Sequence, residues 1–123
     1  MGIRGNRNCA IGKDYEEKAA EYLVRQGMKI LCRNFRCRQG EIDVIGLQGE
    51  YLVFVEVKFR ASAAGGFPEE AVGWQKQKRI CRTALYYLYT HPAYETRPVR
   101  YDVVAVCGGR IRWYKDAFEH HNE

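Results

Sequence analysis

The acidic and basic side chains best suited to chemistry lie in two strand-like runs joined by a short turn. Asp43 stands in the first run, and Glu56 and Lys58 stand two positions apart in the second. Because strand side chains alternate between faces, Glu56 and Lys58 point to the same side of the sheet, on a face that is otherwise apolar. Charges on such a face cost free energy unless they are paired or bind a metal, so the pattern indicates a site.

The turn at residues 47–50 decides whether Asp43 joins the same group. A hairpin loop of two or four residues centred there places Asp43 opposite Phe54. The same register places Glu41 opposite Glu56. Asp43 and Glu56 are then diagonal neighbours, roughly 7–8 Å apart at the backbone, and both carboxylates can reach one ion. A three-residue loop instead sends the two carboxylates to opposite faces.

An Asp followed by Glu-x-Lys on the next strand resembles the core of the PD-(D/E)xK nuclease superfamily. The closer resemblance is to one branch, the uncharacterised bacterial YraN-like proteins, which are similar to archaeal Holliday-junction resolvases. The matching segments are Gly12 with Glu16, Gly40–Asp43 (GEID), Phe54–Lys58 (FVEVK) and Arg100–Val104 (RYDVV). Two positions depart from the superfamily pattern. Ile42 replaces a Pro, as is usual in this branch, and Phe59 stands where a small polar residue is expected.

This resemblance implies a metal-dependent nuclease that hydrolyses phosphodiester bonds, with Mg²⁺ or Mn²⁺ as its cofactor. Mg²⁺ prefers oxygen ligands and keeps several waters, so two carboxylates and a backbone carbonyl suffice to bind it. By the resemblance, Asp43 and Glu56 are direct ligands, together with the carbonyl of Val57. Glu16 is expected to reach the metal through water, and Lys58 to orient the attacking water or help to deprotonate it.

A plainer interpretation of the same residues stays open. In this interpretation the residues are ordinary surface charges at exposed strand ends. Glu56 and Lys58 form a salt bridge there, and Asp43 has no role in binding. Glu16 in a first helical turn is favourable by itself, because a carboxylate there interacts well with the helix dipole. Asp102, in a later strand, is expected to pair with an arginine and is given no catalytic role.

Positive charge favours an anionic partner, since the chain of 123 residues carries a formal net charge of +5. The candidate contacts to a phosphate backbone are Arg36, Arg38, Arg60 and Lys76. In the second helix Lys76 interrupts an inward apolar line at i, i+4 spacing that continues through Ile80 and Ala84. Its side chain therefore either reaches the carboxylates or a phosphate, or extends to the surface. The expected partner is nucleic acid, with branched or recombining DNA as the substrate. The alternative is a solvated basic surface without a partner.

A second function class uses the same fold without turnover. In it the protein is a non-catalytic nucleic-acid-binding module in a DNA repair or uptake assembly, and the acids form a metal or structural site. A homodimer is implied by the resemblance alone, because resolvase-like enzymes usually cut as dimers.

The chain is expected to be a reduced, cytoplasmic protein without a membrane segment. No apolar run approaches the roughly 20 residues of a membrane helix, and no stretch has the character of a signal peptide. The five cysteines are odd in number and show no C-x-x-C spacing, which is typical of reduced thiols.

The elements that must position these residues follow the order helix, three strands, helix, two strands. This order predicts an α/β domain with a central mixed sheet flanked by helices, and the resemblance implies the restriction-endonuclease-like arrangement. We expect a flexible N-terminal segment over 1–11, a single domain over 12–117 and a polar tail over 118–123. The first helix is predicted to begin near Asp14, and the second to run from Pro68 to about Tyr89.

Overall fold

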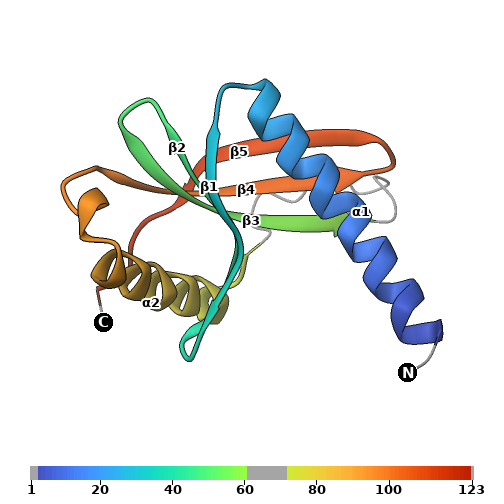
Figure 1. The fold of residues 1–123 in the computed structure, drawn as a ribbon, viewed down its shortest axis with the longest axis horizontal. Helices are drawn as coiled ribbons and strands as arrows, with labels where there is room; N and C mark the ends of the chain where they lie inside the picture. The colour runs from blue at the N-terminus through green and yellow to red at the C-terminus, as the bar shows by residue number, and fades with distance from the viewer. Residues whose placement is uncertain (1–2, 61–71, 123) are drawn as a thin grey trace.

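One mixed β-sheet with helices on its faces forms the architecture (Figure 1). The computed structural model describes residues 3–60 and 72–122, with side chains over 14–59 and 72–122. The elements are α1 (Ile3–Arg25), β1 (Lys29–Cys37), β2 (Gly40–Gln48), β3 (Tyr51–Arg60), α2 (Trp74–Thr90), the 3₁₀ turn η1 (Pro92–Tyr94), β4 (Val99–Cys107) and β5 (Arg110–Phe118). The predicted order of elements and the α/β class are therefore confirmed.

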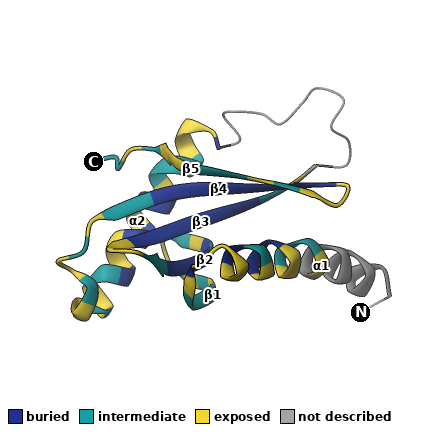
Figure 2. Ribbon diagram, turned by 90° about the horizontal axis from the view of Figure 1, so that it is seen from above, coloured by how far each residue is buried: buried dark blue, intermediate teal, exposed yellow. Residues whose placement is uncertain are grey.

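Strands that follow one another in the sequence are also neighbours in the sheet, in the order β1-β2-β3-β4-β5. β3 and β4 run parallel, and the other adjacent pairs run antiparallel. A parallel pair needs a crossover connection, and α2 lies within it. The two helices pack on opposite faces of the sheet, which leaves the central strands β3 and β4 buried along most of their length (Figure 2).

Alternation along β3 divides the core into two layers. Phe54 belongs to the layer under α2, together with Ile80 and Ala84 of that helix. Val55 belongs to the layer under α1, together with Leu23. The predicted inward stripe of the second helix is confirmed at Ile80 and Ala84, because both side chains are buried.

The hairpin between β2 and β3 closes with the two-residue turn Gly49-Glu50, so that Gln48 pairs with Tyr51. Gly49 has a φ of +58°, a left-handed value that favours glycine. Glycine at the first central position is typical of a tight hairpin turn whose twist matches the strands. The turn therefore lies one residue later than the one centred at residues 47–50.

The later turn shifts the predicted register by two positions. The observed pairs are Ile45 with Phe54, Val44 with Val55 and, across β1, Arg36 with Glu41. The predictions that Asp43 lies opposite Phe54, and Glu41 opposite Glu56, are wrong. Because side chains repeat every two residues along a strand, this shift still leaves Asp43 on the face of Glu56.

α1 begins at Ile3, well before the predicted start near Asp14. The segment over 1–11 that we expected to be flexible is helical from Ile3 onward, and no proline interrupts the helix up to Arg25. Asp14 therefore lies inside the helix, where its carboxylate is 3.7 Å from the Lys18 ammonium one turn later, and it does not cap the helix.

α2 begins at Trp74, and residues 72 and 73 before it are not helical, so the prediction of one continuous helix from Pro68 to Tyr89 is wrong. Gly73 precedes the helix with an extended backbone (φ −75°, ψ 168°). Pro68 itself lies outside the described residues. The helix ends at Thr90, close to the predicted end. Among the described helices, none is long and apolar enough to cross a membrane.

The C-terminal segment packs against the domain, where we expected a polar tail. β5 extends to Phe118. The Tyr101 hydroxyl lies 2.6 Å from Nδ1 of His120, and Nε2 of His121 lies 2.8 Å from the Gln77 side-chain oxygen. Contacts with β4 and α2 therefore hold His120 and His121 in place, although the polarity of the sequence predicted a polar tail there.

Gly46 in β2 is expected to be the least tolerant of a side chain among the described glycines. A Cβ there would lie 2.8 Å from the backbone oxygen of Lys29 and from the side chain of Met28. Gly46→Ala should therefore lower the free energy of unfolding by about 1–3 kcal/mol in urea titrations. Gly73→Ala is the control, because its Cβ would meet nothing within 4 Å. Equal effects of the two substitutions would contradict this packing argument.

Candidate metal centre

β2 and β3 stop pairing after Val44 and Val55, and each strand continues along its outer neighbour. Asp43 stands one residue beyond this last pair on β2. Its Oδ2 accepts a hydrogen bond of 2.8 Å from the backbone N–H of Val57 on β3. In a continued ladder the Val57 N–H would donate to a backbone carbonyl of β2. Here it donates to the Asp43 carboxylate instead. This bond holds Asp43 beside the segment that carries Glu56.

Glu56 is buried, with 7 % of its surface exposed, and it is paired with two ammonium groups. The Lys76 Nζ of α2 lies 3.1 Å from Glu56 Oε2, and the Lys58 Nζ of the same strand lies 3.8 Å from it. A buried carboxylate without such partners would be costly, so the lysines stabilise the site. Two positions were expected for the Lys76 side chain, at the carboxylates or a phosphate, or at the surface. In the structure its ammonium reaches a carboxylate.

Asp43 has an unusual proton affinity. Burial, and then the negative charge of Glu56, raise the pKa of its carboxyl group to about 6, although the Val57 hydrogen bond and Lys76 act in the opposite direction. Two carboxylates that repel one another at close range favour a bound cation or proton. A divalent cation would relieve this repulsion, so the electrostatics of the pair suit metal binding.

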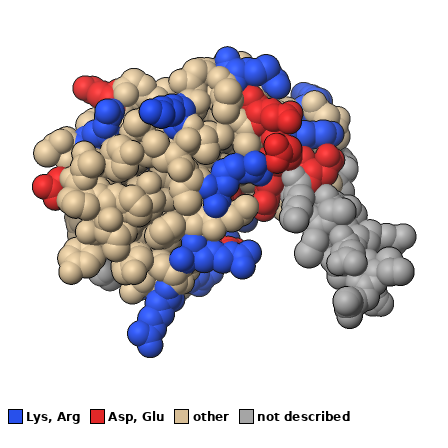
Figure 3. Space-filling view, in the orientation of Figure 1, with Lys and Arg blue, Asp and Glu red and all other residues tan. Residues whose placement is uncertain are grey.

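Glu16 approaches the same group from α1. Burial, and then the charge of Asp43, raise the pKa of the Glu16 carboxyl group, while Arg33 and Arg36 lower it. Figure 3 shows Asp and Glu side chains gathered beside α1, with Lys and Arg side chains around them. The helix therefore places a third carboxylate within electrostatic range of Asp43.

The residues present fit a hard divalent cation with a small protein ligand set. No group of three or more His, Cys, Asp or Glu side chains within the described ranges is arranged to hold an ion. Two carboxylates are nevertheless a common protein contribution to a Mg²⁺ site, because that ion retains several waters. Asp43 and Glu56 would hold the ion with the Val57 carbonyl, and Glu16 is suited to a contact through water.

The predicted arginine contacts are less closely joined to the carboxylates than the lysines are. Arg36 forms an ion pair of 3.0 Å with Glu41 and is largely exposed. Arg38 is exposed in the turn after β1. Arg60 ends β3, and its side chain lies outside the described part of the chain. The structure thus brings Lys58 and Lys76 to the acids and leaves Arg36 and Arg38 on the surrounding surface.

Tyr15 is a neighbour of the site that the sequence analysis did not single out. Burial, followed by the charges of Glu16, Asp43 and Glu56, raises the pKa of its phenol. Its position directly before Glu16 is the signal in the sequence that could have identified it. Its proximity to Asp43 and Glu56 depends on how α1 lies across the sheet, which spacing does not reveal.

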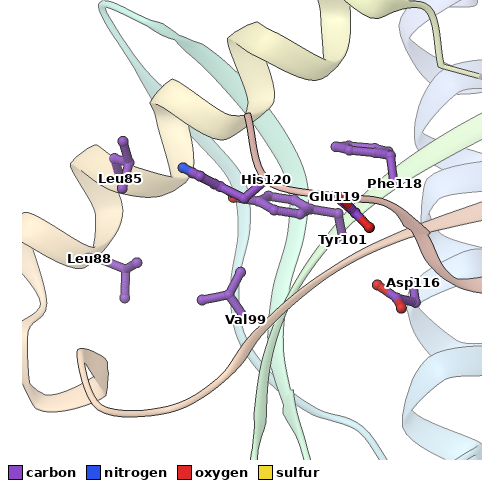
Figure 4. A pocket seen from close by; sticks show the side chains of 8 residues that line it. All are labelled: Leu85, Leu88, Val99, Tyr101, Asp116, Phe118, Glu119 and His120. Atoms are coloured by element: carbon purple, nitrogen blue, oxygen red, sulfur yellow. The ribbon is translucent and has the colours of Figure 1, made fainter. Parts of the chain in front are cut away.

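A separate cavity of about 370 Å³ lies between α2 and the C-terminal strands, and it contains none of the predicted site residues (Figure 4). Its walls are largely apolar and include Leu85, Leu88 and Val99, and the Tyr101–His120 pair lies against it. The candidate metal centre lies instead at the end of the β2–β3 ladder.

The sheet order, the α2 crossover and the acids at the end of the β2–β3 ladder define an α/β domain of the restriction-endonuclease-like class. The chain belongs to the family described as Uncharacterised protein family UPF0102, whose model matches residues 15–106. This range contains every residue of the candidate centre.

Relatives of similar length share much of the sequence. A UPF0102 protein of Lachnoclostridium phytofermentans is 51% identical over 108 residues, which cover 88% of this chain and 92% of the relative. One from Syntrophus aciditrophicus is 47% identical over 123 residues, with 97% and 96% covered. One from Rhodococcus opacus is 44% identical over 116 residues, with 90% and 98% covered. The family thus spans nearly the whole chain.

Proposed function

We propose that this protein is a divalent-metal-dependent nuclease that hydrolyses phosphodiester bonds in DNA, including branched or recombining DNA. The observation that carries the proposal is the meeting of Asp43 and Glu56 at the end of the β2–β3 ladder, with Lys58 and Lys76 against Glu56. Two carboxylates and two ammonium groups at one open strand end match the needs of phosphoryl transfer, where positioning and charge stabilisation supply most of the catalysis.

Each side chain has a distinct part in this proposal. Asp43 and Glu56 would hold Mg²⁺ or Mn²⁺, which when bound would stabilise charge on the phosphate and make water a better nucleophile. Lys58, whose ammonium lies 3.8 Å from Glu56 Oε2, would hydrogen-bond the attacking water or the phosphate oxygens. Lys76 enters the site from α2 and binds the phosphate backbone, for which a flexible ammonium is well suited.

The proposal is tested by cleavage assays with Mg²⁺ or Mn²⁺ on linear, flapped, forked and four-way DNA. Asp43→Ala and Glu56→Gln should abolish cleavage. Lys58→Ala should slow it on the order of 100- to 10,000-fold, the usual contribution of a positioned proton-transfer group. Glu41→Gln is the matched control, because Glu41 is an acid two positions from Asp43 that pairs with Arg36 on the surface.

Cleavage that persists in the Asp43, Glu56 and Lys58 variants would refute the assignment of this site. Binding of DNA in Ca²⁺, with no cleavage in Mg²⁺ or Mn²⁺ on any of the four substrates, would favour the non-catalytic binding module. Binding that does not weaken with salt would argue against a phosphate-backbone partner, because counterion release makes such binding strongly salt-dependent.

A further inference from the structure

Two aromatic side chains stack beside the candidate metal centre. The rings of Tyr15 on α1 and Phe59 on β3 lie with centroids 4.9 Å apart and planes inclined by 23°. Phe59 directly follows Lys58, and Tyr15 directly precedes Glu16. The stack therefore joins the helix and the strand that contribute to the centre.

Phe59 remains 44% exposed although it packs against another ring. Tyr15 stacks on one face of the Phe59 ring, so a ligand has to approach this ring at its other face or at its edge. Phe54 on the same strand is almost fully buried and packs in the core. The Phe59 ring is instead partly exposed to solvent beside charged side chains, so it contributes little to the core. Exposed apolar surface at a functional site is typical of ligand contact.

The stack and the lysines occupy opposite sides of the carboxylates. Residues 57 and 59 point to the α1 side of the sheet by alternation, whereas Glu56 and Lys58 point to the α2 side, where Lys76 meets them. Tyr15 also lies within electrostatic range of Asp43, Glu16 and Glu56. A ligand that spans this end of the sheet thus meets ammonium groups on one side and an open aromatic face on the other.

A nucleotide has this same division, with an anionic phosphate at one end and a flat base at the other. Bases stack on aromatic side chains with little regard to sequence, and each such contact contributes to binding of single strands. Inside a duplex both faces of a base are covered by its neighbours, so only an unpaired or extruded base offers a free face.

We propose that Phe59, supported by Tyr15, stacks on an unpaired nucleobase of DNA next to the phosphate bound at the carboxylates. This inference rests on the proposed function and specifies its substrate class. The site takes DNA with unpaired bases, such as single strands, flaps and forks, in preference to intact duplex.

The test measures DNA binding in Ca²⁺ by fluorescence anisotropy, with a single strand, a flap and a blunt duplex of equal length. Phe59→Ala should weaken binding of the single strand and the flap roughly 5- to 100-fold, the range expected for loss of one base–aromatic stack. Duplex binding should change less than about twofold. Phe59→Trp retains a stacking face and should keep the preference, and 2-aminopurine at the unpaired position should be quenched by the wild type but not by Phe59→Ala.

Each result separates this inference from the nuclease proposal. Equal loss of duplex and single-strand binding in Phe59→Ala, or no loss of either, overturns the stacking role even where Asp43-dependent cleavage is present. Selective loss of unpaired DNA binding, without any cleavage by the wild type, supports the stacking role and refutes the nuclease. A urea titration of Phe59→Ala checks that the fold is intact, as expected for an exposed side chain.

Discussion

Replacing Asp102 with alanine should lower the free energy of unfolding by about 3–5 kcal/mol, the usual result of removing one partner from a buried ion pair. The Asp102 side chain is fully buried within β4, and Arg100 holds it through two hydrogen bonds of 3.0 and 2.9 Å. The Trp113 indole and the Asp116 amide each donate to it at 2.8 Å. Alanine would leave these donors, including a charged guanidinium, without their acceptor.

Urea unfolding at neutral pH measures this effect, with Asp14→Ala as the control. Asp14 also pairs with a cation, Lys18, but on the exposed surface of α1, where such a pair contributes about 0–1 kcal/mol. A loss below about 1 kcal/mol in Asp102→Ala would show that Arg100 and Trp113 find other partners. The pairing with an arginine that the sequence analysis expected is confirmed, and the four donors leave Asp102 a structural role.

Asp43→Asn should have the opposite effect on stability and remove the response to metal. In the folded protein burial and the charge of Glu56 disfavour the charged form of Asp43 and raise its pKa to about 6, above the ordinary aspartate value of 3.8. Folding therefore takes up a proton between these two values, and the stability of the wild type should fall as pH rises from about 4 to about 6. Above pH 6 the charged carboxylate continues to destabilise the fold.

Asparagine has no charge, and its amide oxygen still accepts the hydrogen bond from Val57. The variant should therefore be about 1–3 kcal/mol more stable than the wild type at pH 7–8 without metal, and should lack the decline between pH 4 and 6. Mg²⁺ or Mn²⁺ should raise the melting temperature of the wild type, more so above pH 6, but not that of Asp43→Asn.

Thermal unfolding from pH 4 to 8, with and without Mn²⁺, tests both parts. Glu41→Gln serves as the control because it removes a neighbouring charge that pairs on the surface with Arg36. If Asp43→Asn is less stable than the wild type, the hydrogen bond that the carboxylate accepts stabilises the fold by more than its buried charge destabilises it. An equal response of the variant to Mn²⁺ would place the metal elsewhere.

The two aspartates show how similar residues come to differ in role. Asp102 is satisfied by donors on every side, so its charge stabilises the fold. Asp43 accepts a hydrogen bond from the Val57 amide but lies near the like charge of Glu56, so we expect the ionised carboxylate to destabilise the fold in the absence of a cation. Proteins commonly sacrifice stability in this way at sites that bind or react.

Local pattern in the sequence was enough for the layout of this domain. Alternating apolar residues indicated the strands, and the spacing of Ile80 and Ala84 indicated the buried face of α2. The placement of Asp43 and Glu56 on one face was one of two outcomes that the sequence left open. The two-residue turn decided it, because an error of two residues in register does not change the face of a strand, whereas a three-residue loop would have changed it. The restriction-endonuclease-like arrangement came from the resemblance, because periodicity alone does not fix the topology of a sheet.

Contacts between distant segments were decided only by the tertiary structure. The bond from Val57 to Asp43, the reach of Lys76 to Glu56 and the burial of the C-terminal residues each join positions far apart in the chain. The start of α1 at Ile3 was missed for a related reason, since a polar segment that begins with no strong cap carries little local signal. Periodicity reports which face of an element is apolar, but the partner of that face depends on how helices and strands pack, which no single segment encodes.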